Sequence, residues 1–179
     1  SLIGRIGMNG ATHRIVEFDG PVVAAMNMDA RMTLCNMTVE AGGTCGICYP
    51  DEATADYLWE FIRDDYPDPL AAAAAFRRWW PDPDAVYEEV VVHDVSRLEP
   101  VTTFGLQPDN VKPVRDMQGT PIDQVFIGSC TNGRLDDLRS AARVLRGRKI
   151  HPRVRGIVCP TTPKVFTQAL AEGLVQVFM

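Results

Sequence analysis

The alternation of apolar and polar positions is most regular in the last third of the chain. Short apolar runs over 122–128 and 155–159 predict buried strands, and the apolar end 175–179 predicts a third. Apolar residues at helical spacing predict helices over 135–145 and 162–174. This β-α-β-α-β order favours a parallel sheet, in which ligands gather at the carboxyl ends of the strands.

The first part of the chain has a less regular pattern. Residues 14–18 and 87–95 predict strands. Residues 31–41 predict a helix that ends at two glycines, and residues 69–80 predict an alanine-rich helix. Asp51 has the residue type and position of an N-cap for a further helix.

The segment 98–119 carries prolines at 100, 108 and 113 and predicts a connector between domains. We therefore expect two α/β domains, at 1–104 and 105–179. The chain begins without a methionine and ends in an apolar run, a pattern that favours an excised segment of a longer protein.

Composition and charge exclude some classes of function. Hydrophobic residues make up 46% and charged residues 23%, so the chain can bury a core. The net charge of −5 and the absence of a long basic run disfavour nucleic-acid binding. No apolar run approaches the roughly 18 residues of a membrane span, and no signal peptide is visible, so we expect a cytoplasmic protein without membrane contact.

Cys130 stands where an apolar strand gives way to a helix, among the small polar residues Ser129, Thr131 and Asn132. A thiolate beside a helix N-terminus is stabilised by the helix dipole, which suits a nucleophile or a metal ligand. A core cysteine in a tight turn is the alternative, and the residue types alone leave both open.

Asn36 and Glu40 form a second candidate. On a helix over 31–41 they would be adjacent, on one polar stripe that also holds Thr33. A carboxylate there is suited to general acid–base work, and a solvated helix face is the alternative.

The motif Cys45-Gly-Ile-Cys48 is a C-x-x-C, which can be a redox pair or half of a metal site. It lacks the preceding strand and following helix of a thioredoxin-like motif, so two unlinked thiols are the favoured interpretation. Cys35 and Cys159 lie in apolar runs and are predicted to be core residues.

Several stretches resemble the aconitase superfamily. The run FIGSCTNGRLDDLRSAARVLRGRKI is similar to one family signature, and MDARMTLCNMTVEAGG is similar to another. The flanking stretches IGMNGATHRIVEFDG and PDEATADYL fit the same family in the same order. The likeness is greatest to the 3-isopropylmalate dehydratase and homoaconitase large subunits. It implies three-layer α/β/α domains with largely parallel sheets, comprising part of the family's second domain and the start of its third.

The resemblance implies a [4Fe–4S] hydro-lyase that dehydrates and rehydrates a small 2-hydroxy di- or tricarboxylic acid, here 2- and 3-isopropylmalate of leucine biosynthesis. It implies that Cys130 is one of three cysteine ligands of the cluster and that Ser129, Thr131 and Asn132 shape its pocket. It implies catalytic roles for Glu40, beside the open iron, and for Asn36. A small dehydratase subunit is the implied partner, in a heterodimer.

The sequence departs from the family pattern downstream of Cys130. The family's second and third ligands form a later C-x-x-C, and no such pair follows Cys130 here. We therefore expect a chain that folds but holds no stable cluster and is inactive alone. Homoaconitase or another 2-hydroxy-acid dehydratase, a thiol-disulfide protein using Cys45 and Cys48, and a non-catalytic subunit-interface domain are the alternatives.

Overall fold

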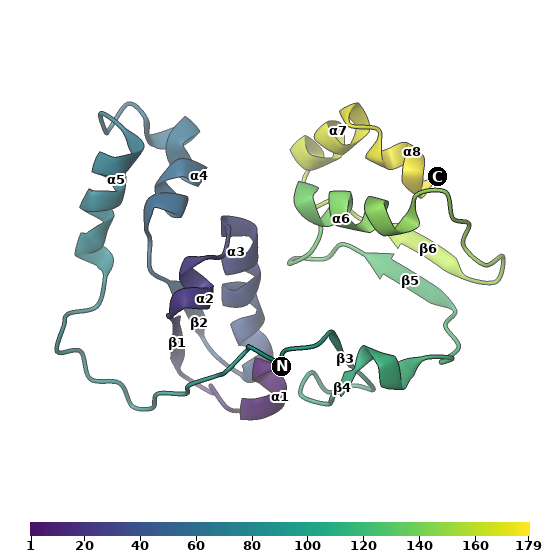
Figure 1. Cartoon of the computed structure of the whole chain (residues 1–179), viewed down its shortest axis with the longest axis horizontal. Coiled ribbons are helices and arrows are strands. Elements are labelled where there is room, and N and C mark those ends of the chain that lie inside the picture. Colours follow the sequence, from purple (N-terminus) through teal and green to yellow (C-terminus); the bar gives the residue numbers. More distant parts are fainter. The chain divides into compact units, whose positions relative to one another are not determined.

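The computed structural model describes residues 1–179 and is of mixed α/β class with small sheets (Figure 1). The chain divides into two compact units, Ser1–Asp116 and Met117–Met179. None of its helices combines the length and the apolar character that crossing a membrane would require.

The first unit is built on two parallel strands, β1 (Ile15–Phe18) and β2 (Cys45–Cys48). The chain between them forms the helices α2 (Pro21–Ala24) and α3 (Met28–Asn36), so a helical crossover joins the strands as parallel pairing requires. The short helix α1 (Leu2–Ile6) precedes this motif.

The helix predicted over 31–41 is only partly α-helical. Helix α3 ends at Asn36, and a 3₁₀ helix, η1 (Met37–Ala41), continues the chain to Gly42 at φ +81°. A 3₁₀ helix turns about 120° per residue rather than 100°. A spacing of four residues therefore no longer returns to the same face, and the predicted stripe that joins Asn36 to Glu40 is not continuous.

Helices α4 (Glu52–Ile62) and α5 (Pro69–Phe76) follow β2 and lie side by side in Figure 1. The 3₁₀ turn η2 (Arg77–Trp79) comes directly after α5. The predicted N-cap of α4 is confirmed, because the Asp51 carboxylate accepts a hydrogen bond from Thr54 N at 3.3 Å. The small alanine side chains allow the two helices to pack closely, and their buried core consists of Ala55, Ala72, Ala73 and Phe76.

The strand predicted over 87–95 does not form. This stretch has no regular structure, and side-chain contacts rather than β-sheet hydrogen bonds hold its beginning against the first strand. Arg14 pairs with Glu88, and Tyr87 Oη donates a hydrogen bond to Glu17 at 2.7 Å. The predicted connector contains a hairpin of β3 (Val101–Thr103) and β4 (Val111–Pro113), followed by the 3₁₀ turn η3 (Val114–Met117).

The second unit pairs β5 (Gln124–Ile127) with β6 (Arg155–Val158) in parallel, and helix α6 (Leu135–Leu145) connects them. Helix α7 (Pro163–Ala171) follows β6. The core lies between the helices and consists of Leu138, Ala142, Ala169 and Leu174.

Two predictions for this unit are wrong. The apolar end is a helix, α8 (Leu174–Phe178), and not a third strand. Gly173 at φ +73° lets the chain turn directly from α7 into α8, and apolar residues of α8 pack on the helical core. A short apolar run suits a buried helix as well as a strand, so its periodicity could not decide. Cys159 is exposed rather than buried, because it lies just after β6 ends.

Candidate functional site

The predicted thiol site lies in a tight turn directly after β5. The turn begins with Gly128 at φ +140° and Ser129 at φ +84°. A positive φ is uncommon for a non-glycine residue and persists only where the surrounding structure holds it. Cys130 follows at once and is exposed. The turn therefore presents the thiol at the carboxyl end of a parallel strand.

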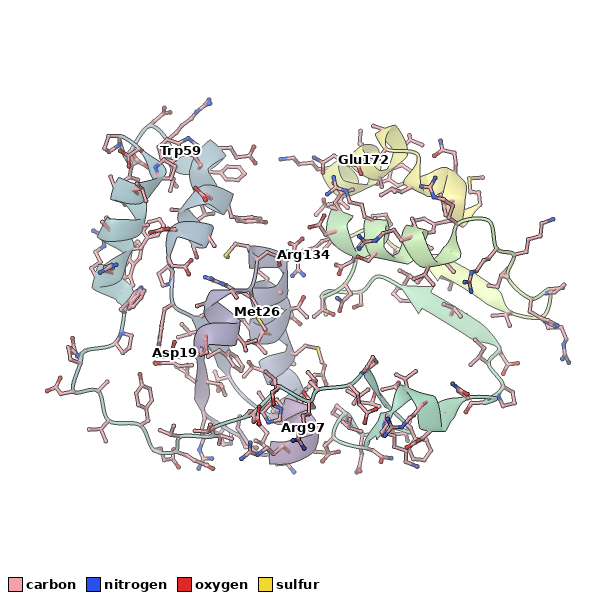
Figure 2. The ribbon with its side chains drawn as sticks, in the orientation of Figure 1. Asp19, Met26, Trp59, Arg97, Arg134 and Glu172 are labelled. Atoms are coloured by element: carbon pink, nitrogen blue, oxygen red, sulfur yellow. The ribbon has the colours of Figure 1, made fainter.

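Hydrogen bonds within the turn fix its shape. Thr131 N donates to Ser129 Oγ at 3.4 Å, and the two hydroxyl oxygens lie 3.3 Å apart. Thr131 is only 6% exposed, and its carbonyl oxygen accepts a hydrogen bond from Arg134 Nη1 at 2.6 Å. Figure 2 shows Arg134 where α6 begins. Ser129 and Thr131 thus support the backbone on either side of Cys130.

Asp137 is a functional candidate that the sequence reasoning missed. One of its carboxylate oxygens accepts from Asn132 Nδ2 at 3.2 Å, and the other accepts from Arg134 N at 3.1 Å. Asp137 therefore both caps α6 and orients the Asn132 amide. The available signal was a carboxylate three residues after the N-cap position, Arg134, which is the acidic half of a capping box.

The end of β6 closes the other side of the turn. Thr161 N donates to Gly133 O at 2.9 Å, and a Cβ built on Gly133 would lie 2.7 Å from the Cys159 carbonyl oxygen. A side chain at this position would collide with backbone, so glycine is required for the approach. The structure thus holds Ser129, Cys130, Thr131 and Asn132 in one turn.

The predicted carboxylate site lies in the first unit. Glu40 is exposed on η1 and lines a cavity of about 330 Å³, in which it is the only carboxylate. The hairpin contributes Thr102 and Thr103 to the lining, and Met37 lies beside them. Asn36 is also exposed but does not line this cavity. Ser1, Glu40 and the two threonines are the polar residues of this cavity, and the other lining residues are apolar.

The C-x-x-C motif occupies the whole of β2, and the chain forms no disulfide. Residues three apart on a strand point to opposite faces and lie about 10 Å apart, which is beyond the reach of a disulfide. The structure therefore supports the favoured interpretation, in which Cys45 and Cys48 are unlinked thiols. Cys48 instead meets Cys35 of α3, with the two Sγ atoms 3.6 Å apart.

No three histidine, cysteine or carboxylate side chains converge in a way that could hold a metal ion. A [4Fe–4S] cluster requires several protein ligands, usually cysteine thiolates. Cys130 is a suitable donor by its position, but its neighbours in the turn supply only hydroxyls, an amide and backbone groups. The residues of this chain therefore do not make a complete cluster site.

The sequence of the chain matches one family of proteins. The profile of the aconitase family, described as aconitate hydratase, matches residues 1–120 and 112–179. Because these ranges cover the whole chain, the chain belongs to the aconitase family.

The most informative relatives are 3-isopropylmalate dehydratase large subunits. The one from Desulfosudis oleivorans is 62% identical over 179 residues, which are 100% of this chain and 42% of that protein. The one from Geobacter sulfurreducens is 61% identical over 99% of this chain and 42% of its own length. The one from Heliobacterium modesticaldum is 44% identical, over 99% of this chain and 40% of its length. The chain thus spans about two fifths of the curated relatives that it matches.

Proposed function

We propose that this chain is part of the large subunit of a hydro-lyase that interconverts 2-isopropylmalate and 3-isopropylmalate in leucine biosynthesis. The observation that carries the proposal is the 62% identity to a dehydratase large subunit, which extends over every residue of the chain. Such identity favours a shared substrate over the homoaconitase alternative. The proposal includes a small-subunit partner and a cytoplasmic location.

The proposed architecture follows from the family. Residues 1–104 would belong to one three-layer α/β/α domain and residues 105–179 to the next. Each unit of the structure has its own two-stranded parallel sheet, which supports two separate domains, since sheets of this kind are normally wider and covered on both faces.

Cys130 is the proposed cluster ligand of this chain. Aconitase-family proteins carry a [4Fe–4S] cluster, which acts as a Lewis acid on a hydroxyl group when it is bound. The exposed thiol, the fixed turn and the nearby hydroxyls of Ser129 and Thr131 suit one such ligand. The remaining ligands would come from the longer protein, because Cys159 is the one other thiol of the second unit and no three ligand side chains converge at the turn.

Glu40 is the proposed proton-transfer residue. Its carboxylate is accessible and faces a cavity large enough for a small carboxylic acid. The Asn36 amide is proposed to donate to, or accept from, a substrate oxygen. Asn132 is proposed to help shape the pocket around Cys130, with its amide oriented by Asp137.

The test of the function uses the full-length protein that contains this segment, co-expressed with its small subunit and reconstituted with iron and sulfide without oxygen. We expect turnover of 3-isopropylmalate and a loss of at least 100-fold in kcat for Glu40→Gln. Turnover of homocitrate or citrate, with none of isopropylmalate, would refute the substrate assignment. Unchanged kcat in Glu40→Gln would refute the role of that residue.

A second test uses the 179-residue chain alone. Iron and acid-labile sulfide are measured per chain after anaerobic reconstitution, for wild type and Cys130→Ala. We expect near-zero values for both. Iron and sulfide near four per chain would overturn the prediction that this chain holds no stable cluster by itself.

A further inference from the structure

Two half-buried cysteines from different elements meet in the first unit. Cys35 lies on the last turn of α3 and Cys48 lies at the end of β2. Cys35 Sγ donates a hydrogen bond to Cys48 Sγ across 3.6 Å. The proposed function does not use this contact.

Backbone packing brings the two thiols together. A Cβ built on Gly46 would lie 2.7 Å from both the Cα and the carbonyl oxygen of Cys35. Glycine at this position therefore lets the end of α3 rest directly on β2. The sulfurs meet because their backbones are fixed in contact, so the pair does not depend on one rotamer of a long side chain.

A buried arginine, paired with a half-buried carboxylate, stands beside the thiols. Arg31 lies one helical turn before Cys35 and is 3% exposed, and both of its terminal nitrogens donate to Asp51 at 2.7 Å. Burial and the hydrogen bond with Cys35 raise the pKa of the Cys48 thiol to about 12, against a smaller lowering effect of Arg31. Cys48 is thus a slow nucleophile in the reduced protein, and its reaction needs a partner thiol held next to it.

We propose that Cys35 and Cys48 are a redox pair, which a small disulfide converts to an intrachain disulfide. The Cys35 thiolate attacks one sulfur of the small disulfide, forms a mixed disulfide and releases one small thiol. The Cys48 thiolate then attacks the Cys35 sulfur and releases the second small thiol. Two protein thiols are oxidised, one small disulfide is reduced to two thiols, and the two protons leave with these products.

The geometry allows the bond, and the bond would change the chain. The two sulfurs must come about 1.5 Å closer, which rotation about the two Cα–Cβ bonds can supply. The new link would close the loop of residues 36–47, which contains η1 and Glu40. Oxidation would therefore tie α3 to β2 and restrict the segment that carries this carboxylate.

The test maps disulfides in the 179-residue chain after incubation with oxidised glutathione and alkylation of the remaining thiols. A glutamate-specific protease cuts after Glu17, Glu40 and Glu52, so Cys35 falls in peptide 18–40 and Cys48 in peptide 41–52. We expect these two peptides to remain joined until a reductant is added. The exposed Cys45 is expected to carry glutathione in the same sample.

Matched variants decide between outcomes. Cys45→Ser keeps the joined peptides, whereas Cys35→Ser and Cys48→Ser abolish them. Cys48→Ser leaves glutathione on Cys35, and Cys35→Ser leaves Cys48 as a free thiol, because Cys48 reacts slowly without its partner. Oxidation in concentrated urea should give a mixture of pairings, which shows that the native fold selects the pair. Glutathione on both Cys35 and Cys48 of the folded wild type, or a Cys45–Cys48 bond within peptide 41–52, would overturn the proposal.

Stability gives a second readout that does not depend on peptide mapping. Because the link restricts the unfolded chain, the oxidised protein should melt several degrees above the reduced protein, by about 5 °C. The difference should vanish in Cys35→Ser and persist in Cys45→Ser. Equal melting temperatures of oxidised and reduced wild type, with the link present, would refute the claim that the link constrains this segment.

Discussion

Replacing Arg31 with alanine should destabilise the first unit more than any exposed charge substitution. Arg31 is 3% exposed, and its guanidinium makes two 2.7 Å hydrogen bonds to Asp51. It also donates to Met26 O at 3.1 Å and to Ala24 O at 3.0 Å. Met26 is marked in Figure 2. The Arg31 side chain therefore connects α3, by hydrogen bonds, to the last residue of α2, to the loop that follows it and to the N-cap residue of α4.

The magnitude follows from what the substitution would leave behind. Alanine removes the partner of a half-buried carboxylate and leaves two carbonyl oxygens without their donor. Breaking a fully buried ion pair on one side costs about 3 to 5 kcal/mol, and the loss here should be smaller, about 2 to 3 kcal/mol, because the Asp51 side chain is 31% exposed. With a urea dependence of about 1.5 kcal/mol per molar, the unfolding midpoint should fall by about 1.5 to 2 M. Since domains are stable by only about 5 to 15 kcal/mol, this is a large share of the total.

Tryptophan fluorescence during urea unfolding is the appropriate assay, because the three tryptophans, at 59, 79 and 80, all lie in the first unit. The matched control is Arg14→Ala, which removes an exposed arginine that pairs with Glu88 in the same unit. Exposed pairs contribute little, so this midpoint should stay close to that of wild type. Arg31→Lys should fall between the two, because lysine keeps the charge but cannot donate from two fixed nitrogens to Asp51. Equal midpoints for Arg31→Ala and Arg14→Ala would refute the reasoning.

Three further predictions concern pH, the cap of α6 and a close glycine. The hydrogen bonds from Arg31 lower the pKa of Asp51, so the ion pair stabilises the fold above pH 4. This stabilisation is lost as the pH falls through the pKa of Asp51 in the folded protein. The urea midpoints at pH 7 and pH 3 should therefore differ less for Arg31→Ala than for wild type. Asp137→Ala should destabilise the second unit by about 1 kcal/mol, seen as earlier loss of helical circular dichroism, whereas Asp136→Ala removes only an exposed pair with Arg139 and should not. Gly133→Ala should cost about 1 to 3 kcal/mol in the same measurement, because its Cβ would meet the Cys159 carbonyl, and an unchanged melting curve would contradict that contact.

Local signals in the sequence predicted local structure well. The strand at 14–18, the N-cap at Asp51 and the helix over 135–145 each depend on neighbouring residues, and all three are confirmed. The strand over 87–95 and the apolar end depended on distant partners. Neither found a neighbouring strand, so the first stayed irregular and the second became helical. A short apolar run does not carry the information about which partner will cover it.

For the candidate site too, the sequence predicted relations between neighbouring residues better than relations that depend on the three-dimensional structure. Ser129, Cys130, Thr131 and Asn132 are consecutive, so one turn was bound to bring them together. The relation between Asn36 and Glu40 assumed an unbroken α-helix, and the change to 3₁₀ geometry after Asn36 removes that relation. The sequence carried a capping signal for Asp137, but not its hydrogen bond to Asn132. The Cys35–Cys48 contact depends on packing through Gly46, which only the three-dimensional structure reveals.

The solvent exposure of the proposed catalytic groups indicates that, on the proposed function, other parts of the protein must complete the active site. Glu40 and Cys130 are both open to solvent here. Proton transfer to carbon and stabilisation of a developing charge are effective where water is excluded and the donors are fixed. This chain fixes the turn around Cys130 and places Glu40 at a cavity, but it does not exclude water from either. On the proposed function, the covering surface must therefore come from the rest of the large subunit and from the small subunit, and activity should appear only when both are present.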